Sequence, residues 1–141
     1  MAVPPKNLSQ DQIELLKDQG FALKEEGWTF DISSKVLFET DSLHLTPASR
    51  PALERVGKAL MRVGINRLRL EGHTDSQGNV DYNRRLSVAR AQSVAEALIA
   101  VGINRDHITA RGLGMSRPVA DNRTAAGRAE NRRVAIIVAS E

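Results

Sequence analysis

The sequence contains no cysteine, which excludes disulfides and thiolate metal sites. Aromatic residues make up only 4% of the chain, so its core must be mainly aliphatic. Apolar runs are short, and even residues 134–139 fall far below the roughly 20 residues that a membrane helix needs. No apolar signal segment follows Met1, so we expect either a cytoplasmic protein or one whose leader has been removed. What remains is a 141-residue chain with 41% hydrophobic residues, which suits one globular domain.

Positive charge is concentrated toward the C-terminal end. Residues 1–100 balance 13 Lys and Arg against 13 Asp and Glu, whereas residues 101–141 hold seven arginines and four acidic residues. Arginine can bind a carboxylate or phosphate through two parallel hydrogen bonds, which lysine cannot do. The pattern indicates either a solvated basic face or an anion-binding surface. We expect no nucleic-acid partner, because the arginines are not interleaved with aromatic stacking positions.

Hydrophobic periodicity predicts a short helix and then strands that alternate with helices. The first helix should span residues 10–19, with a capping box of Ser9 and Gln12 at its start and Gly20 at its end. It is too short to be stable alone, so it must dock on the domain or on a partner. Even positions from 28 to 38 are mostly apolar, which predicts one or two strands with one buried face.

The rest of the chain repeats one connection and ends in a buried strand. The sequence VGINR occurs at 63–67 and 101–105, and each copy combines a helix end, a glycine stop and the approach to a strand. The run 134–138 is apolar at every position, as expected of a central strand or of one packed in an interface. The remaining elements are a helix opened by Pro47 and capped by Thr46, a strand at 67–73, a helix at about 81–101, a strand at 107–112 and a brief helix at 124–131. The order predicts one sheet with helices packed against it.

The stretch EGHTDSQG, residues 71–78, gathers polar residues at the end of a predicted strand. Arg90 lies on the next helix, in the middle of the apolar stripe formed by Leu86, Val94, Leu98 and Val101. A guanidinium in that position is costly unless it is paired, and Asp75 is the nearest candidate partner. The pair is either a structural salt bridge or part of a crevice beside a helix N-terminus. Such a crevice would offer Asp75 to an ammonium and Arg90 to a carboxylate, so it would suit a zwitterionic ligand.

Catalysis and metal binding are less favoured by the same residues. A zinc site needs three or more ligands, and the other two histidines have no ligand-like spacing to His73 and Asp75. Ser76 lacks the G-x-S-x-G frame of a strained nucleophile, and residues 112–116 lack the spacing of a phosphate loop. His73 and Thr74 are expected to support the turn. We expect no cofactor and no enzymatic activity, and a hydrolase or metal enzyme centred on His73 and Asp75 remains the alternative.

Four segments together resemble the C-terminal OmpA-like domain, over about residues 28–141. They read LEGHTDSQG, YNRRLSVARAQSVAEAL, RGLGMSRPVADN and GRAENRRVAIIV, in the family's order and spacing. The resemblance implies an α/β fold of the OmpA-like two-layer type, a mixed β-sheet packed against helices. It also implies non-covalent binding of peptidoglycan in the periplasm through the diaminopimelate of the stem peptide. Diaminopimelate carries its own ammonium and carboxylate, which matches the zwitterion inferred above.

The resemblance assigns eight positions to this ligand. The aspartate of the HTD motif falls on Asp75 and the helix arginine on Arg90. Gly78 is expected to let the loop approach the ligand closely. The other assigned positions are Phe38, Asp41 and Ser42 after the first strand, Asn83 early in the helix, and Arg132 of the NRR motif.

Residues 8–38, read together with RGLGMSRPVADN at 111–122, resemble YfiB-type outer-membrane lipoproteins, and residues 1–27 are then the N-terminal extension that precedes the OmpA-like domain. This resemblance implies sequestration of a YfiR-like periplasmic repressor, which would relieve inhibition of a membrane diguanylate cyclase in cyclic-di-GMP signalling. Leu16, Phe21 and Trp28 are the expected partner surface, and burial in the core is the alternative interpretation. The lipidated cysteine of such proteins is missing, so the tail before Asn7 is expected to stand in place of the signal peptide and outer-membrane anchor. An interaction adaptor without wall binding is the alternative function, and a homodimer is left open.

Overall fold

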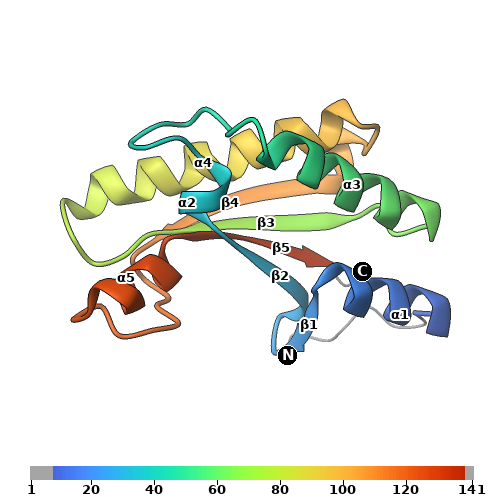
Figure 1. Ribbon diagram of the computed structural model, residues 1–141, viewed down its shortest axis with the longest axis horizontal. Coiled ribbons are helices and arrows are strands. Elements are labelled where there is room, and N and C mark those ends of the chain that lie inside the picture. The colour runs from blue at the N-terminus through green and yellow to red at the C-terminus, as the bar shows by residue number, and fades with distance from the viewer. Residues whose placement is uncertain (1–7, 139–141) are drawn as a thin grey trace.

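The computed structural model describes residues 8–138, so the predicted tail before Asn7 lies outside the described residues. A five-stranded sheet runs through the molecule in the order β1-β2-β5-β3-β4. β3 and β4 are parallel and the other pairs are antiparallel, which confirms the predicted mixed sheet. Helices α3 and α4 cover one face of it (Figure 1). The elements are α1 (Gln10–Gln19), β1 (Ala22–Lys24), β2 (Gly27–Ser33), α2 (Ser34–Leu37), α3 (Ser49–Arg62), β3 (Leu68–His73), α4 (Val80–Ala100), the 3₁₀ turn η1 (Arg105–His107), β4 (Ile108–Gly114), α5 (Ala125–Asn131) and β5 (Arg133–Val138).

The N-terminal helix forms as predicted and docks on the domain. Ser9 and Gln12 make the reciprocal capping box, and Gly20 ends α1 in the left-handed region at φ 101°. The side-chain amide of Gln12 also donates to the carbonyl of Val63 at the end of α3, at 2.8 Å. Leu16 is fully buried in the common core. The extension is therefore packed against the rest of the domain rather than separate from it.

The first strand is shorter than the sequence predicted. β2 ends at Ser33, and the next four residues form the helical turn α2, which Ser33 caps by accepting from the amide of Lys35. Val36 is consequently 59% exposed, where the strand prediction had placed it on the buried face. The next helix begins at Ser49 rather than at Pro47, although the Thr46 hydroxyl accepts from the Ser49 amide at 3.2 Å.

Both copies of VGINR act as helix stops, as predicted. Gly64 and Gly102 adopt positive φ values of 80° and 122°. In each copy the following isoleucine amide bonds back to a leucine carbonyl in the helix, Ile65 to Leu60 at 2.9 Å and Ile103 to Leu98 at 3.3 Å. Both isoleucines, Ile65 and Ile103, are buried. The repeated sequence therefore encodes the same Schellman-type turn twice.

The core lies between the sheet and the two long helices. β5 is central and its residues are buried throughout, which confirms the predicted central strand. α4 approaches the sheet closely because Gly72 on β3 and Gly112 on β4 have no side chain. A Cβ at Gly72 would lie 2.1 Å from the Ser87 carbonyl oxygen, and one at Gly112 would lie 2.4 Å from Val88.

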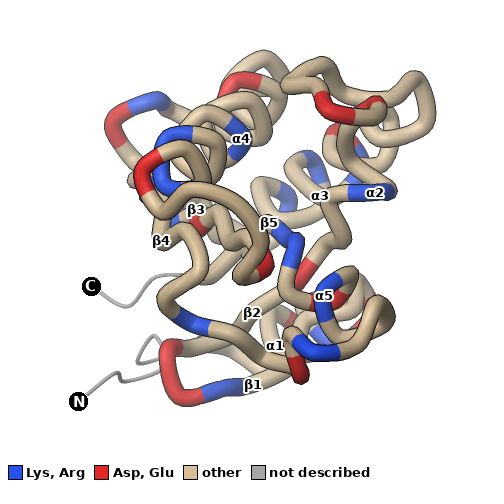
Figure 2. The backbone as a smooth tube through the Cα atoms, turned by 90° about the vertical axis from the view of Figure 1, so that its left-hand side faces the viewer, with Lys and Arg blue, Asp and Glu red and all other residues tan. Residues whose placement is uncertain are grey.

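The opposite face of the sheet carries no long helix among the described residues (Figure 2). α5 and the loop before it lie near one end of that face, apart from α4. No helix in the described part of the chain is long and apolar enough to span a membrane.

Candidate functional site

Asp75 lies just after β3, in a loop that fixes its carboxylate. Oδ1 accepts from the Gln77 amide at 2.9 Å, and the Asn83 side-chain amide donates to the Gln77 carbonyl at 2.7 Å. Gly78 in this loop has φ 90°, whereas a Cβ there would find ordinary contact distances. Gly78 is therefore needed for its backbone conformation, and Asn83 and Gly78 hold the loop that presents Asp75.

Asp75 is paired with Arg132, not with Arg90. The Arg132 Nη1 donates to Asp75 Oδ2 at 2.5 Å, and no ion pair joins Asp75 to Arg90 among the described residues. The Arg132 side chain is 41% exposed, while that of Asp75 is only 9% exposed. The predicted Asp75–Arg90 salt bridge is thus wrong for this structure. Arg132, which the family resemblance assigns to the same ligand as Asp75, lies directly beside Asp75.

Arg90 lies on the flank of α4 instead of facing the sheet. The sheet-facing line consists mainly of small or polar residues, namely Asn83, Ser87, Ala91, Val94 and Leu98, and Leu86 is only partly buried. The sequence prediction therefore placed the sheet-facing stripe of α4 too far toward Leu86 around the helix axis. Arg90 faces the loop after α2 and stacks over the Phe38 ring, with its Cζ 5.1 Å from the ring centroid.

The guanidinium of Arg90 has unused hydrogen-bonding capacity. Its Nη2 donates a long bond of 3.4 Å to the Ser42 carbonyl, and its buried Nε has no hydrogen-bond partner among the described residues. Burial lowers the pKa of Arg90 below its ordinary value, Tyr82 and Asp41 act in the opposite direction, and Arg132 lowers it further. A partly buried cation with free donors and a second cation nearby is suited to binding an anion.

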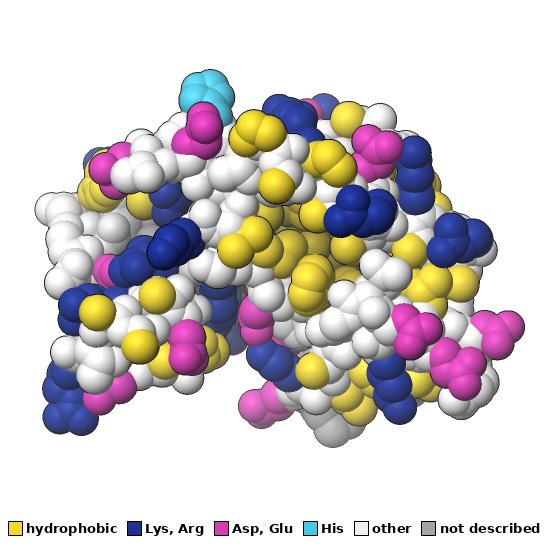
Figure 3. Space-filling model, viewed as in Figure 1, with side chains coloured by type: hydrophobic (Ala, Val, Ile, Leu, Met, Phe, Trp, Pro, Cys, Tyr) yellow, Lys and Arg dark blue, Asp and Glu magenta, His cyan; other side chains and the backbone are white. Residues whose placement is uncertain are grey.

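Arg90 and Arg132 share a hollow of about 480 Å³ beside the start of α4. Figure 3 shows basic side chains gathered on this side of the face, below the first turns of α4. Asp41 lies at its rim and has a positive φ of 52°. The lining residues are Ser34, Lys35, Phe38, Glu39, Thr40, Asp41, Tyr82, Leu86, Arg90 and Arg132. We call this cavity the helix-side hollow.

The structure brings most of the predicted ligand residues to this place. Phe38, Asp41, Arg90 and Arg132 line the helix-side hollow, and Ser42 contributes a carbonyl to Arg90. The remaining three do not line the hollow. Asp75 binds Arg132, and Asn83 and Gly78 shape the loop of Asp75 as described above. Their individual roles toward a ligand stay predictions.

Sequence reasoning missed Tyr82 and Lys35 as lining residues. Tyr82 lies on the first turn of α4 and is 56% exposed. The usable signal in the sequence was that it is the one tyrosine of the chain. Lys35 was hidden by the strand prediction for residues 28–38. It lines the hollow because α2 is a helical turn.

The three residues assigned to a partner surface are buried. Leu16, Phe21 and Trp28 are 0, 4 and 7% exposed and belong to one core cluster. Packing between α1, β2 and α3 therefore accounts for them in this structure, and partner contact by these side chains stays a prediction. An apolar groove of about 310 Å³ does lie beside them, lined by Phe30, Ile32 and Val36 among others. Figure 3 shows apolar side chains gathered in the middle of that face.

The enzyme alternative finds no support in the placement of His73. Its side chain lies on the face of the sheet that α3 and α4 leave uncovered, away from the helix-side hollow. In the described residues no group of three or more His, Asp or Glu is placed to hold a metal ion. The expectation that His73 supports the turn was wrong, because neither ring nitrogen makes a hydrogen bond within the described chain. Thr74 does so, by donating to the Asp75 carbonyl at 2.9 Å.

A mixed sheet with a cationic hollow at the end of β3 and the start of α4 is the arrangement of a domain suited to binding an anionic or zwitterionic ligand. The OmpA family model matches residues 37–132, and the chain belongs to the OmpA family.

Individual proteins agree with this assignment. The chain is 53% identical to the outer-membrane lipoprotein YfiB of Pseudomonas aeruginosa, over 98% of this chain and 82% of that protein. It is 42% identical to the peptidoglycan-binding protein ArfA of Mycobacterium tuberculosis, over 73% of this chain and 32% of that one. Among solved structures, the cell wall anchor of the T6SS from Pseudomonas aeruginosa is 33% identical, covers 96% of this chain and 98% of its own, and superposes with a TM-score of 0.75.

Proposed function

We propose that this protein binds peptidoglycan non-covalently through the diaminopimelate of the stem peptide, in the helix-side hollow. The carrying observation is the pair of guanidiniums, Arg90 and Arg132, that line one hollow while Asp75 lies directly behind Arg132. The names of the relatives support a periplasmic, outer-membrane-anchored lipoprotein as the full-length form. The relatives are named as binding or anchoring proteins, which supports a non-enzymatic role.

The geometry suggests how a zwitterion enters. Without ligand, Asp75 and Arg132 neutralise each other, and Arg90 keeps an unpartnered Nε. The ligand carboxylate would bind Arg90 and Arg132, and its ammonium would take the place of Arg132 on Asp75. The Asp75–Arg132 ion pair is then replaced by contacts in which each charge of the ligand faces an opposite charge on the protein, and Arg90 gains an anionic partner. The Phe38 ring would hold Arg90 in position throughout.

The test is a calorimetric titration with a diaminopimelate-containing muropeptide. We expect Arg90→Ala and Asp75→Ala to weaken binding at least about tenfold, which corresponds to about 1.4 kcal/mol. Arg85→Ala is the matched control, because Arg85 is an exposed arginine on the same helix, and it should bind like the wild type. Equal affinity for all four proteins would overturn the assignment of the site. Melting curves must accompany each variant, because removing one member of a buried pair also destabilises the fold.

We further propose that the N-terminal side of the molecule sequesters a YfiR-like periplasmic protein and thereby relieves inhibition of a membrane diguanylate cyclase. The apolar groove beside α1, with Val36 59% exposed at its edge, supports this role. Leu16, Phe21 and Trp28 would act by holding α1 against this groove, or by direct contact once α1 undocks. Residues 1–27 would form the extension that carries this function, and residues 28–141 the wall-binding domain.

A pull-down of the YfiR-like repressor tests whether the apolar groove is the partner surface and whether partner capture depends on wall binding. Val36→Asp should abolish capture, whereas Val119→Asp, an equally exposed valine in the loop before α5, should not. Retained capture by the Val36 variant would contradict the groove as partner surface. Capture by a protein that has no muropeptide affinity would favour the adaptor without wall binding.

A further inference from the structure

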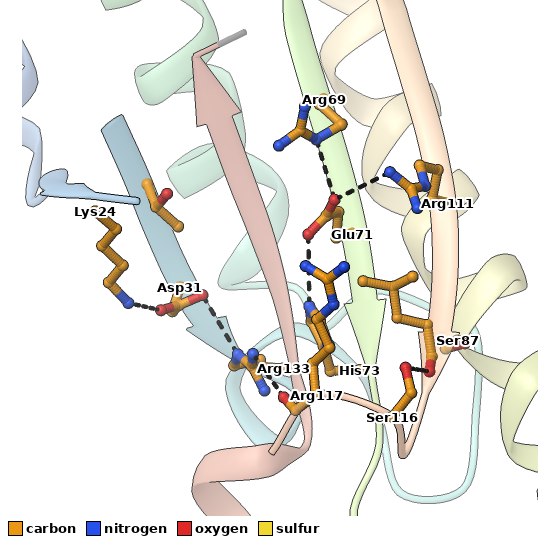
Figure 4. A network of polar contacts seen from close by, with 12 residues as sticks. Lys24, Asp31, Arg69, Glu71, His73, Ser87, Arg111, Ser116, Arg117 and Arg133 are labelled. Atoms are coloured by element: carbon orange, nitrogen blue, oxygen red, sulfur yellow. Dashed lines mark hydrogen bonds and ion pairs between the residues drawn. The ribbon is translucent and has the colours of Figure 1, made fainter. Parts of the chain in front are cut away.

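The helix-free face of the sheet carries charged side chains that are largely buried (Figure 4). Glu71 and His73 on β3 and Arg133 on β5 have side chains only 8, 3 and 8% exposed. Asp31 on β2 lies beside them. Charged groups are rarely buried unless they are well paired, so this arrangement requires a physical reason.

Strand register creates a hollow at this place. Ala135 on β5 lies opposite Asp31 on one neighbouring strand and opposite Glu71 on the other. A methyl group therefore stands between two carboxylate side chains, and a cavity of about 170 Å³ opens there. Three cationic and three anionic side chains line it, namely Lys24, Arg117, Arg133, Glu26, Asp31 and Glu71. We call it the sheet-side hollow.

Each of the two central carboxylates is bound at one oxygen and underused at the other. Lys24 donates to Asp31 Oδ2 at 2.6 Å, and Arg69 donates to Glu71 Oε2 at 3.0 Å. The second oxygens have only long contacts, Asp31 Oδ1 to Arg133 Nε at 3.4 Å and Glu71 Oε1 to His73 Nε2 at 3.9 Å. Both contacts are long, so within the described chain each of these oxygens keeps room for a stronger donor.

The cationic side of the hollow is equally underused. Arg133 donates two bonds of 3.3 Å to the carbonyls of Asn131 and Arg117, and its Nε has no hydrogen-bond partner in the described chain. The Arg117 side chain makes no hydrogen bond or ion pair with any described residue and lies at the open side. Buried polar groups in native proteins are nearly always satisfied, so the buried Nε of Arg133, beside the exposed Arg117, indicates a missing binding partner.

His73 adds a neutral polar group to this wall. Its Nδ1 is fully buried and unpartnered in the described chain. The pKa of His73 is lowered to about 4, mainly by burial and also by Arg133 and Arg117, while Asp31 acts in the opposite direction. The imidazole is therefore uncharged near neutral pH, where one ring nitrogen can donate and the other can accept.

We propose that the sheet-side hollow is a second ligand site that takes a small zwitterion, a free α-amino acid of about the size of alanine. The ammonium is bound by the second oxygens of Asp31 and Glu71, and the carboxylate by Arg133 and Arg117. A ligand with a single charge would leave the opposite set of groups unpaired. The volume of about 170 Å³ holds about six non-hydrogen atoms if each takes the ~30 Å³ share of a liquid water, and alanine has that size.

An NMR titration of the whole chain with L-alanine and with D-alanine tests this site. We expect one of the enantiomers to shift the backbone amides of Thr29, Glu71 and Ala135. Propionate and ethylamine, each with one of the two charges, should cause no such shift at the same ionic strength. The absence of a shift with both enantiomers, or equal shifts with propionate or ethylamine, would overturn the proposal and leave the groups as a structural network.

Two variants keep the test independent of folding and of wall binding. Arg117→Ala removes an exposed side chain that has no hydrogen bond or ion pair within residues 8–138, so it should fold normally and bind alanine at least tenfold more weakly. Arg123→Ala is the matched control on the same loop, where the guanidinium pairs with the exposed Asp121, and it should bind like the wild type. Unchanged binding by the Arg117 variant would contradict the assigned carboxylate partner. A muropeptide should leave the Ala135 amide unshifted, because the helix-side hollow lies on the other side of the sheet.

Discussion

Arg132 and Arg133 are adjacent in the chain, yet they serve opposite sides of the sheet. Arg132 ends α5 and reaches Asp75 in the helix-side hollow, where 41% of its side chain is exposed. Arg133 begins β5 and lies on the helix-free face near Asp31, where 8% is exposed. Successive residues of a strand point to opposite faces, so one step along the chain separates the two environments.

This difference sets what each arginine can do. Arg132 is 41% exposed, so the outer side of its ion pair with the buried Asp75 is open to solvent, and a ligand ammonium can take the place of Arg132. Burial lowers the pKa of Arg133 below its ordinary value, and Asp31, Glu26 and Glu71 oppose that effect. The helix-side hollow is thus suited to exchange of partners at its exposed arginine, whereas in the sheet-side hollow Arg133 is buried against strand carboxylates.

The strongest expected effect is on the face that α4 covers. Gly72→Ala would place a methyl 2.1 Å from the Ser87 carbonyl, so α4 must move away from the sheet. We expect the free energy of unfolding to fall by more than about 3 kcal/mol, measured by urea denaturation. Gly57→Ala is the control, because its Cβ would meet the movable Val101 side chain at 2.8 Å, and it should cost less. Equal costs would mean that the close helix–sheet approach is not rigid.

The next largest effect concerns the loop that walls the helix-free face. Asn131 is fully buried; it accepts from the amides of Val119 and Ala120 and donates to the Ala120 carbonyl. Asn131→Ala leaves these backbone groups unpaired, so we expect a loss of about 2 to 3 kcal/mol and faster proteolysis of this loop. Asn104→Ala, which removes one exposed cap, should cost under about 1 kcal/mol. An intact, protease-resistant loop in the Asn131 variant would contradict this role.

Acid should destabilise the helix-free face through His73. The folded pKa of about 4 lies below the ordinary 6.5, so between these values the unfolded chain binds more protons and stability falls as pH falls. From pH 7 to pH 5 this amounts to about 2 kcal/mol, given ~1.4 kcal/mol per pKa unit. His73→Gln should flatten the pH dependence of urea unfolding by that amount, whereas substitution of the exposed His44 should not. An unchanged slope in the His73 variant would show that the imidazole is not buried neutral.

The smallest effect is expected in the helix-side hollow. Phe38→Leu keeps an apolar contact with Arg90 but removes the ring face beneath the guanidinium. We expect muropeptide affinity to fall only a few-fold, in line with ~0.5–1 kcal/mol for such a contact. Because Phe38 is 3% exposed and belongs to the core, we also expect a loss of stability of about 1 kcal/mol. Isothermal titration provides the measurement. A loss as large as that of Arg90→Ala would mean that Phe38 contacts the ligand itself.

The elements that local chemistry encodes were predictable from the sequence. The capping box of Ser9, the two VGINR stops and the central strand 134–138 all depend on residues close together in the chain. Four residues that line the helix-side hollow, Phe38, Asp41, Arg90 and Arg132, could be named from the family resemblance, but their pairing could not. Which arginine reaches Asp75 depends on the orientation of α4 in three dimensions.

The failures have identifiable physical causes. Where a helix lies very close to a sheet, small residues face the sheet, so Ser87 and Ala91 mark the contact and the bulkier Leu86 does not. Because the prediction followed the bulky residues, it placed Arg90 on the sheet-facing side of α4 instead of on its flank. The alternation of residues 28–38 looked like one pattern, although Ser33 caps a helical turn in its middle. The sheet-side hollow escaped notice because Asp31, Glu71 and Arg133 come from three distant strands.

The central claim is that the helix-side hollow recognises a zwitterion, and one titration tests it most directly. Two muropeptides should be compared that differ only at the third stem residue, one with diaminopimelate and one with lysine, which keeps the side-chain ammonium but lacks the second carboxylate. With Arg90 and Arg132 both in the hollow, we predict that the lysine form binds at least about tenfold more weakly, a loss of about 1.4 kcal/mol. Equal binding of the two muropeptides would contradict the account.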